Sequence, residues 1–415
     1  MARICVVRQL YYPRDEKLRR EIDTLLEAGH EVDLFCMRDD GEPSTDRREA
    51  LTVRRLPLAH RRGKIARYLA EYAAFHVLAT LAISVYHLRR RYALVQVNTP
   101  PDSLVFSSIV PRLFGAKVLL QLTEPMPEFF ATKFKLSPTH LAVRFVATVE
   151  QLSLRYADLA IACTEHMRAA CIGRGALPEK IAVVTVASDE SVFDVTRYPG
   201  RARESGRYVL ISHGTIEERY GLDTAVRAVS LLRDEIPGLR LRIFGTGSYR
   251  ETVRSLAADL GVSDNVEFSR GWVPVSDLLA AIADADVGLV AMKRDAFRDL
   301  THNLKMYDFV TMRKPAIVSR TRSVDDYFDD DCFRKFQADD EHDLARAIRD
   351  LYADRTLGDR LVARATEVNE PYRWRHQREM YLDVVTRLVA HQPVQRHSVA
   401  QQRCADSSFQ DRLDA

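Results

Sequence analysis

YVLISHGTIEERYGLDTAVRAV (residues 208–229) and DLTHNLKMYDFVTMRKP (residues 299–315) are the two segments that decide the fold. Between them, one short apolar run ends in Gly245-Thr246-Gly247 and another ends at Gly271-Trp272. Short apolar runs that alternate with helical spacing are typical of a parallel α/β sheet, which binds ligands beyond the carboxyl ends of its strands. The Gly, Arg, His and Asn residues at these ends suit an anionic, phosphate-bearing ligand. The stretch therefore predicts an anion site at one edge of a sheet.

A second alternating series of strands and helices precedes this stretch. We expect two Rossmann-like, doubly wound α/β domains facing a central cleft. Their predicted bounds are residues 1–195 and 207–374, joined by a linker at 196–206 that is polar and broken by Pro199, Gly200 and Gly206. A helix at about 375–392 is expected to join the first domain. The polar, aperiodic residues 393–415 predict a disordered tail.

Composition narrows the class of protein. The chain has 415 residues and a net charge of +3, which does not favour a nucleic-acid partner. Its six cysteines show no C-x-x-C spacing, and three of them sit in apolar strand-like runs, where a free thiol behaves as a small hydrophobic residue. This pattern favours a reduced, cytoplasmic protein. The histidines form no H-E-x-x-H motif or Cys/His cluster, so no metal site is predicted.

Residues 61–93 form a long apolar segment with basic ends. Glu71 and His76 interrupt it, so our first interpretation is a core helix; an interfacial helix is the second and a membrane span the third. The interfacial reading predicts peripheral contact with the inner face of the cell membrane through residues 54–91. It depends on the flanking basic residues Arg54, Arg55, Arg61, Arg62, Lys64, Arg67, Arg89, Arg90 and Arg91.

The loop at residues 212–221 is the first candidate for ligand binding. Gly214 allows a close approach of backbone amides, and Arg219 has the bidentate geometry that a diphosphate accepts. The alternative is a surface loop with a solvated arginine.

The segment 299–308 is the second candidate. Capping of a helix by Thr301 or Asn303 would leave amides near Leu304 and Lys305 for phosphate oxygens, with Asp308 one turn later. The alternative is an amphipathic helix whose polar residues face water.

Two further loops carry weaker signals. Gly245 and Gly247 follow a strand, but no G-x-G-x-x-G or P-loop pattern completes them. Glu124 and Glu128 stand beside two prolines after the run AKVLLQL, where they could orient an acceptor or form a stiff, solvated turn.

Taken in order, these segments resemble the glycosyltransferases of family 4, which are retaining enzymes of the GT-B architecture. DEKLRREIDTLLEAGHEVDLFC is similar to the family's opening helix with its G-H-E-V ending, and HGTIEERYGLD resembles its phosphate loop. NTPPDSLVF and EPMPE resemble a bacterial subgroup, and NLKMYDFVTMRKPAIV resembles the stretch P-N-K-L-F-E-Y-M-A-x-G-K-P-V-I. The resemblance extends from the first strand to about residue 390.

The resemblance implies a metal-independent enzyme that needs no cofactor and uses a nucleoside-diphosphate sugar as donor. It places the donor in the second domain and a sugar or lipid-linked acceptor on the first. Arg219 and Lys305 would stabilise the leaving diphosphate, and Asp308 matches the glutamate that holds the ribose. The implied donor-binding residues are His213, Gly214, Thr215, Gly245, Gly247, Trp272, Asn303 and Leu304, and the acceptor-side residues are Glu124 and Glu128.

The chain departs from the family pattern at several positions, three of them in the candidate site. Thr215 and Tyr220 replace a usual arginine and lysine, and Leu300 stands where the first glutamate is expected, next to Asp299. We therefore expect sugar transfer in polysaccharide or glycolipid biosynthesis. A nucleotide-sugar epimerase and a non-catalytic sugar-binding protein are the alternatives.

Overall fold

The computed structural model describes residues 1–58, 65–200 and 206–392. Its contacts divide the chain into unit 1 (Met1–Thr185 and Gln377–Ala415) and unit 2 (Val186–His376). The predicted tail at 393–415, part of the predicted linker, and Arg61, Arg62 and Lys64 lie outside the described residues.

Unit 1 contains an eight-stranded sheet in the order β3-β4-β2-β1-β5-β6-β7-β8. All pairs are parallel except β3 with β4, an edge hairpin that the polar sequence of β3 did not indicate. From β1 the order runs through β2 and β4 one way and through β5 to β8 the other, so the doubly wound pattern is confirmed. The strands are β1 (Arg3–Tyr11), β2 (Glu31–Met37), β3 (Thr45–Arg48), β4 (Leu51–Leu56), β5 (Leu94–Asn98), β6 (Lys117–Gln121), β7 (Leu159–Ala162) and β8 (Ile181–Val183).

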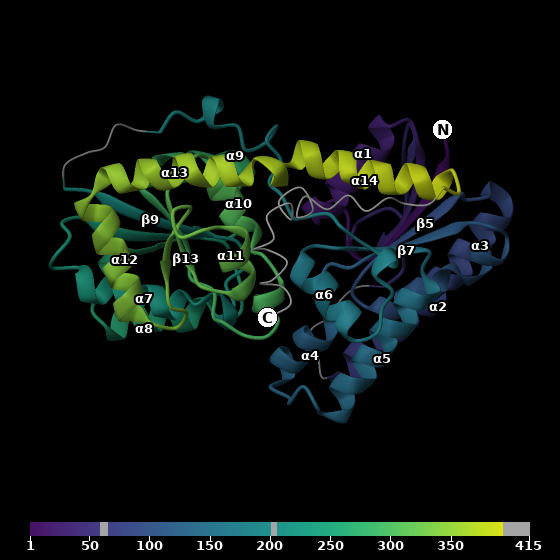
Figure 1. Ribbon diagram of the computed structural model, residues 1–415, viewed down its shortest axis with the longest axis horizontal. Helices are drawn as coiled ribbons and strands as arrows, with labels where there is room; N and C mark the ends of the chain where they lie inside the picture. Colours follow the sequence, from purple (N-terminus) through teal and green to yellow (C-terminus); the bar gives the residue numbers. More distant parts are fainter. Residues whose placement is uncertain (59–64, 201–205, 393–415) are drawn as a thin grey trace. The chain divides into compact units, whose positions relative to one another are not determined.

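Helices cover both faces of this sheet (Figure 1). On one face, the apolar stripe of α1 (Glu16–Glu27) and residues Tyr381 to Leu388 of α14 (Trp374–Val389) form one buried cluster with the strands. Asp15 caps α1 by accepting a 3.1 Å hydrogen bond from the Leu18 amide. The other helices are α2 (Ile65–Arg90), α3 (Ile109–Leu113), α4 (Met126–Phe134), α5 (Leu141–Tyr156) and α6 (Glu165–Gly173). Short 3-10 helices are η1 (Asp102–Ser108) and η2 (Pro178–Lys180).

The long apolar segment forms α2, which starts at Ile65. None of the helices in the described ranges is long and apolar enough to cross a membrane. The expectation that Arg54 and Arg55 belong to a basic membrane surface is wrong. Both are buried in β4, where Arg54 lies 3.4 Å from Asp33 and Arg55 lies 3.0 Å from Glu42, because a guanidinium taken into a sheet needs an ionic partner.

Unit 2 contains a six-stranded parallel sheet in the order β11-β10-β9-β12-β13-β14. The order reverses between β9 and β12, so their carboxyl ends form the switch point at which such sheets bind ligands. The strands are β9 (Tyr208–His213), β10 (Leu239–Phe244), β11 (Val266–Phe268), β12 (Val287–Val290), β13 (Ala316–Ser319) and β14 (Arg334–Phe336). The expected pair of Rossmann-like α/β domains is therefore confirmed.

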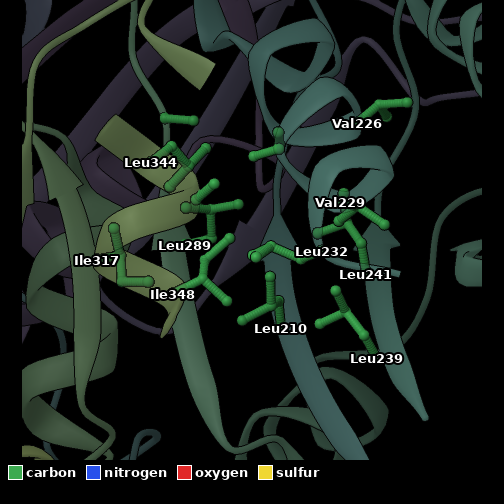
Figure 2. Packing of buried hydrophobic residues seen from close by; sticks show 14 of the residues in the cluster. Leu210, Val226, Val229, Leu232, Leu239, Leu241, Leu289, Ile317, Leu344 and Ile348 are labelled. Atoms are coloured by element: carbon green, nitrogen blue, oxygen red, sulfur yellow. The ribbon is translucent and has the colours of Figure 1, made fainter. Parts of the chain in front are cut away.

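The core of unit 2 lies between this sheet and the helices α7 and α12. Leu210 and Leu289 of the central strands pack with Leu232 of α7 and Ile348 of α12 (Figure 2). The helices are α7 (Leu222–Leu232), α8 (Arg250–Asp259), α9 (Val275–Asp284), α10 (Leu304–Thr311), α11 (Arg322–Tyr327), α12 (Glu341–Ala353) and α13 (Arg355–Asn369). The 3-10 helices are η3 (Val195–Arg197), η4 (Glu218–Tyr220), η5 (Ser263–Asn265), η6 (Arg298–Leu300) and η7 (Glu370–Tyr372).

Unit 2 begins earlier along the chain than the predicted linker at 196–206. The reason is visible at Ser188, whose buried hydroxyl donates a hydrogen bond to Asp308 of α10. This contact ties the segment after Val186 to the second sheet.

Candidate active site

The centre of the candidate site is the carboxyl end of β9, at the switch point of unit 2. The strand ends at the buried His213, and Gly214 follows with φ +96°, a conformation that favours glycine. A Cβ at position 214 would lie 2.9 Å from Cε of Lys305. The side chain of Lys305 therefore runs directly over the backbone of Gly214, where the chain leaves the strand.

Lys305 is delivered by the first turn of α10. Asn303 caps this helix by accepting a 3.0 Å hydrogen bond from the Lys305 amide, as predicted, and its Nδ2 lies 2.9 Å from the sulfur of Met292. Leu304 is the first helical residue, and the amides of a first helical turn have no partner within the helix. An N-terminus of this kind attracts negative charge.

Three cationic side chains lie around the ring of Tyr220. The distances from the ring centroid are 4.1 Å to Lys305 Nζ, 5.2 Å to Arg219 Cζ and 6.0 Å to Arg298 Cζ. Positive charges at such distances from an aromatic ring are attracted to its face. The tyrosine that replaces the family's lysine thus serves as a platform for three positive charges.

These charges act on each other. Burial lowers the pKa of Lys305 to about 7; the charges of Arg298 and Arg219 also lower this pKa, while Asp308 raises it. Burial, with the charge of Lys305, lowers the pKa of His213 to about 3, so this imidazole is neutral at pH 7. Arg219, Arg298 and Lys305 thus bring three cationic side chains into one site, which suits an anionic ligand.

Asp308 lies about one turn after Lys305, on the buried side of α10. It is 4% exposed, accepts a hydrogen bond from Ser188, and has Oδ2 3.5 Å from Nε2 of His213. That pair lacks hydrogen-bond geometry, since His213 Nε2 has no hydrogen-bond partner among the described residues. Asp308 thus contacts the side chains of Ser188 and His213, which both belong to unit 2.

The glycines of the second loop serve loop packing. A Cβ on Gly245 would lie 1.9 Å from the carbonyl oxygen of Gly214, and one on Gly247 would lie 2.0 Å from that of Ile216. The Gly214 amide donates a 2.8 Å hydrogen bond to the Phe244 carbonyl. The absence of a side chain at Gly245 and Gly247 thus lets the loops after β9 and β10 pack closely. Thr215, in the loop after β9, is exposed.

The loop after β11 presents Trp272, whose side chain is 79% exposed. Nearby, a hollow of about 760 Å³ opens at the ends of β10 and β11, within the size range of ligand pockets. Phe244 and Phe268 line it together with the arginines Arg242 and Arg270. The sequence gives no sign of this hollow, because its lining residues form no recognisable motif.

Arg298 was also missed. It lies in η6, within the irregular stretch between β12 and α10, where no periodic pattern indicates the direction of a side chain. Its neighbour Asp299 accepts hydrogen bonds from Arg294 Nε at 3.1 Å and from the Arg322 amide at 2.8 Å. Asp299 thus links this stretch to the start of α11.

The acceptor-side candidates lie in unit 1. Glu128 of α4 accepts a 2.5 Å hydrogen bond from Arg174, which also donates two bonds of 2.8 Å to Glu150. Burial raises the pKa of Glu128. The negative charge of Glu124 contributes to a raised pKa at the buried Asp102, although burial is the main cause. Glu128 thus belongs to an ion-pair cluster that the sequence did not reveal.

Within the described ranges, no group of three or more His, Cys, Asp or Glu residues could hold a metal ion.

Comparison with known families assigns both units. Residues 17–187 match the family described as Glycosyl transferase 4-like domain, and residues 199–368 match Glycosyl transferases group 1.

Two curated relatives match parts of the chain. A GDP-mannose-dependent alpha-(1-6)-phosphatidylinositol monomannoside mannosyltransferase from Mycolicibacterium smegmatis is 40% identical over 93 residues, 21% of this chain and 24% of the relative. The lipopolysaccharide core biosynthesis glycosyltransferase LpsE from Rhizobium meliloti is 29% identical over 187 residues, 45% and 50% of the two chains. The matched part thus spans half or less of each relative.

Solved structures share the fold at low identity. A sucrose-phosphate synthase from Thermosynechococcus elongatus superposes with a TM-score of 0.74 at 18% identity, covering 94% of this chain and all of the other. Anabaena Alr3699/HepE, in complex with UDP-glucose, gives 0.69 at 13% identity, with coverage of 93% and 100%.

Proposed function

We propose that this chain, a glycosyltransferase of the GT-B architecture by its fold and its two family matches, transfers a sugar from a nucleoside-diphosphate sugar to a hydroxyl acceptor. The observation that carries the proposal is the group of Arg219, Arg298 and Lys305 around Tyr220, at the switch point of unit 2.

The donor would bind with its diphosphate against this group. Three cations and the Leu304 amide at the start of α10 would face the phosphate oxygens, in a site where Lys305 is 9% exposed. Gly214 leaves room for the Lys305 side chain over the backbone at the end of β9. Two relatives support this donor class by their names, since one is GDP-mannose-dependent and another was solved with UDP-glucose.

Catalysis would consist of stabilising the diphosphate as it leaves. Negative charge grows on the leaving group while the acceptor hydroxyl attacks, and a preorganised donor aimed at that charge is worth about 3 kcal/mol. Arg219 and Lys305 are the catalytic candidates, and Arg298 joins them. Because these residues supply neutralising charge, we include metal independence in the proposal. Retention of configuration is included because the chain resembles a family of retaining enzymes.

The remaining residues have supporting roles in the proposal. Asp308 would hold the ribose or, through His213 and Ser188, position the helix that carries Lys305. Trp272 and the hollow at the ends of β10 and β11 are candidates for the nucleobase. Glu124 and Glu128 remain the acceptor-side candidates.

The acceptor would be a sugar or lipid-linked glycan in polysaccharide or glycolipid biosynthesis. The names of the mannosyltransferase and LpsE support this pathway class, and both proteins are transferases, which favours transfer over epimerisation.

Calorimetry with UDP, GDP and dTDP tests the donor site, followed by mass spectrometry of products from the matching nucleotide sugars. We expect one nucleotide to bind and Arg219→Ala to lower turnover more than donor binding. Arg227→Ala, an exposed arginine of α7, is the control. If none of the three nucleotides binds at millimolar concentration, the proposal is wrong.

A further inference from the structure

Helix α2 of unit 1 is apolar on two faces. One face packs against the sheet through Phe75, Ala79 and Ile83, all buried. The opposite face exposes four apolar side chains at helical spacing: Val77, Leu81, Val85 and Leu88. Leu81 is 60% exposed, so this stripe is open along several turns of the helix.

Two other helices of the same unit expose apolar side chains. On α3 and at its end these are Ile109, Leu113 and Phe114, and on α5 they are Leu141, Phe145 and Leu152. Leu113 is 79% exposed and Phe145 is 69% exposed. Single exposed apolar residues are ordinary, but apolar side chains repeated on three helices mark an interaction surface.

Direct contacts join the three helices. Cζ of Arg91, just after α2, lies 5.1 Å from the ring centroid of Phe114, and Cζ of Arg112 in α3 lies 4.3 Å from that of Tyr156 in α5. Figure 1 shows α2, α3 and α5 on the side of the sheet opposite α1 and α14. We call the exposed apolar residues of α2, α3 and α5 the three-helix face.

The exposed charged side chains of α2, α3 and α5 themselves are basic. Exposed arginines accompany the three-helix face at the end of α2 and along α5: Arg89, Arg91, Arg144 and Arg155. The acidic residues within these three helices are Glu71 and Glu150, and each pairs with an arginine, Arg67 at 3.3 Å and Arg174 at 2.8 Å. Neither acid is exposed.

We propose that the three-helix face docks unit 1 on an anionic lipid bilayer. Apolar side chains would enter the boundary between headgroups and acyl chains, and the arginines would contact anionic headgroups, as amphipathic surface helices do. A second copy of this chain fits less well, because a symmetric contact would bring arginines against arginines. The proposal extends the function above by placing the acceptor domain where lipid-linked acceptors reside.

Flotation of the full chain with vesicles tests the proposal. We expect it to float with vesicles of phosphatidylglycerol and phosphatidylcholine, and to remain unbound with phosphatidylcholine alone or at high salt. The double variant Leu81→Glu/Phe145→Glu should bind at least tenfold more weakly, and Arg144→Gln about fivefold. Leu231→Glu, an exposed leucine of α7 in unit 2, is the matched control and should float like the unchanged protein.

Nucleotide binding of each variant is measured in parallel. Circular dichroism and thermal unfolding show whether unit 1 of each variant is folded. Retained nucleotide binding shows that the donor site in unit 2 is intact, which separates failure of docking from failure of the donor site. The proposal is overturned if the unchanged chain does not float with anionic vesicles, or if the double variant floats equally well. It is also overturned if sedimentation shows a dimer that the double variant dissociates, because the face then belongs to self-association.

Discussion

The ammonium nitrogen of Lys305 lies 4.1 Å from the centroid of the Tyr220 ring. Burial, together with the charges of Arg298 and Arg219, lowers the pKa of this lysine to about 7. Without a bound anion, Lys305 is therefore only partly protonated near neutral pH.

Donor binding should therefore take up a proton. A bound diphosphate raises the pKa of Lys305, so affinity is constant well below pH 7 and falls as pH rises from about 7 toward the pKa of the complex. Calorimetry at pH 8 in buffers of different ionisation enthalpy should show uptake approaching one proton. A nucleotide sugar is the suitable ligand, since its diphosphate does not titrate there.

Lys305→Met is the control for this titration. It should bind donor more weakly at pH 6 and lose the fall in affinity between pH 7 and pH 9. The same pH dependence in Lys305→Met and the unchanged protein would assign the proton to another group.

The ring of Tyr220 should matter more than its hydroxyl. Tyr220→Phe keeps the aromatic face that Lys305 and Arg219 contact, so we expect nearly unchanged turnover. Tyr220→Leu removes a cation–π contact worth about 0.5–2 kcal/mol, so kcat/KM should fall by a factor of roughly 2 to 30. Steady-state kinetics of Tyr220→Phe and Tyr220→Leu tests this role. An equal loss of kcat/KM in both variants would contradict a cation–π contribution of the ring.

Gly214 should tolerate no side chain without loss of activity. In Gly214→Ala the new Cβ would meet Lys305 Cε at 2.9 Å, and the residue would keep φ +96° at a cost of about 1–3 kcal/mol. We expect a lower melting temperature and at least a tenfold fall in turnover, because Lys305 must move from Tyr220.

Gly29→Ala separates strain from displacement of the lysine. Gly29 has φ +79°, and its Cβ would meet no atom within 4 Å. It should cost similar stability but leave turnover of the folded enzyme unchanged. A Gly214→Ala variant that loses only stability would show that Lys305 has room to adjust.

Local pattern predicted most of the strands and helices, and the edge of the sheet where Arg219 and Lys305 meet. Arg219 follows β9, and Lys305 lies in the first turn of α10, the helix after β12. The carboxyl ends of parallel strands share one edge, so the proximity of these residues follows from chain order. The Asn303 cap was readable for the same reason, because a cap acts over two or three residues.

Contacts between distant residues were not readable. Ser188 reaches Asp308, and Arg174 reaches Glu128, across long sequence separations that packing determines. Arg54 and Arg55 looked like surface charges because the polar hairpin strand β3, which places β4 inside the sheet, has no apolar signature. From the sequence alone, Tyr220 was interpreted only as a replacement of the family's lysine. Its contacts with the three cationic side chains depend on packing and are seen only in the structure.

Glu128 offers a test that separates an acceptor contact from a structural ion pair. Its Oε1 lies 2.5 Å from Arg174, and the two side chains are 18% and 22% exposed. Glu128→Gln removes one charged partner of an arginine that is largely shielded from water, so we expect stability to fall by about 1–3 kcal/mol. Glu179→Gln changes an exposed glutamate of η2 and should leave stability unchanged in the same urea titration.

If Glu128 also contacts the acceptor, the KM for acceptor should rise in Glu128→Gln while the KM for donor stays constant. Unchanged stability together with a raised acceptor KM would show that the acceptor contact, rather than the Arg174 pair, is the main role of this carboxylate.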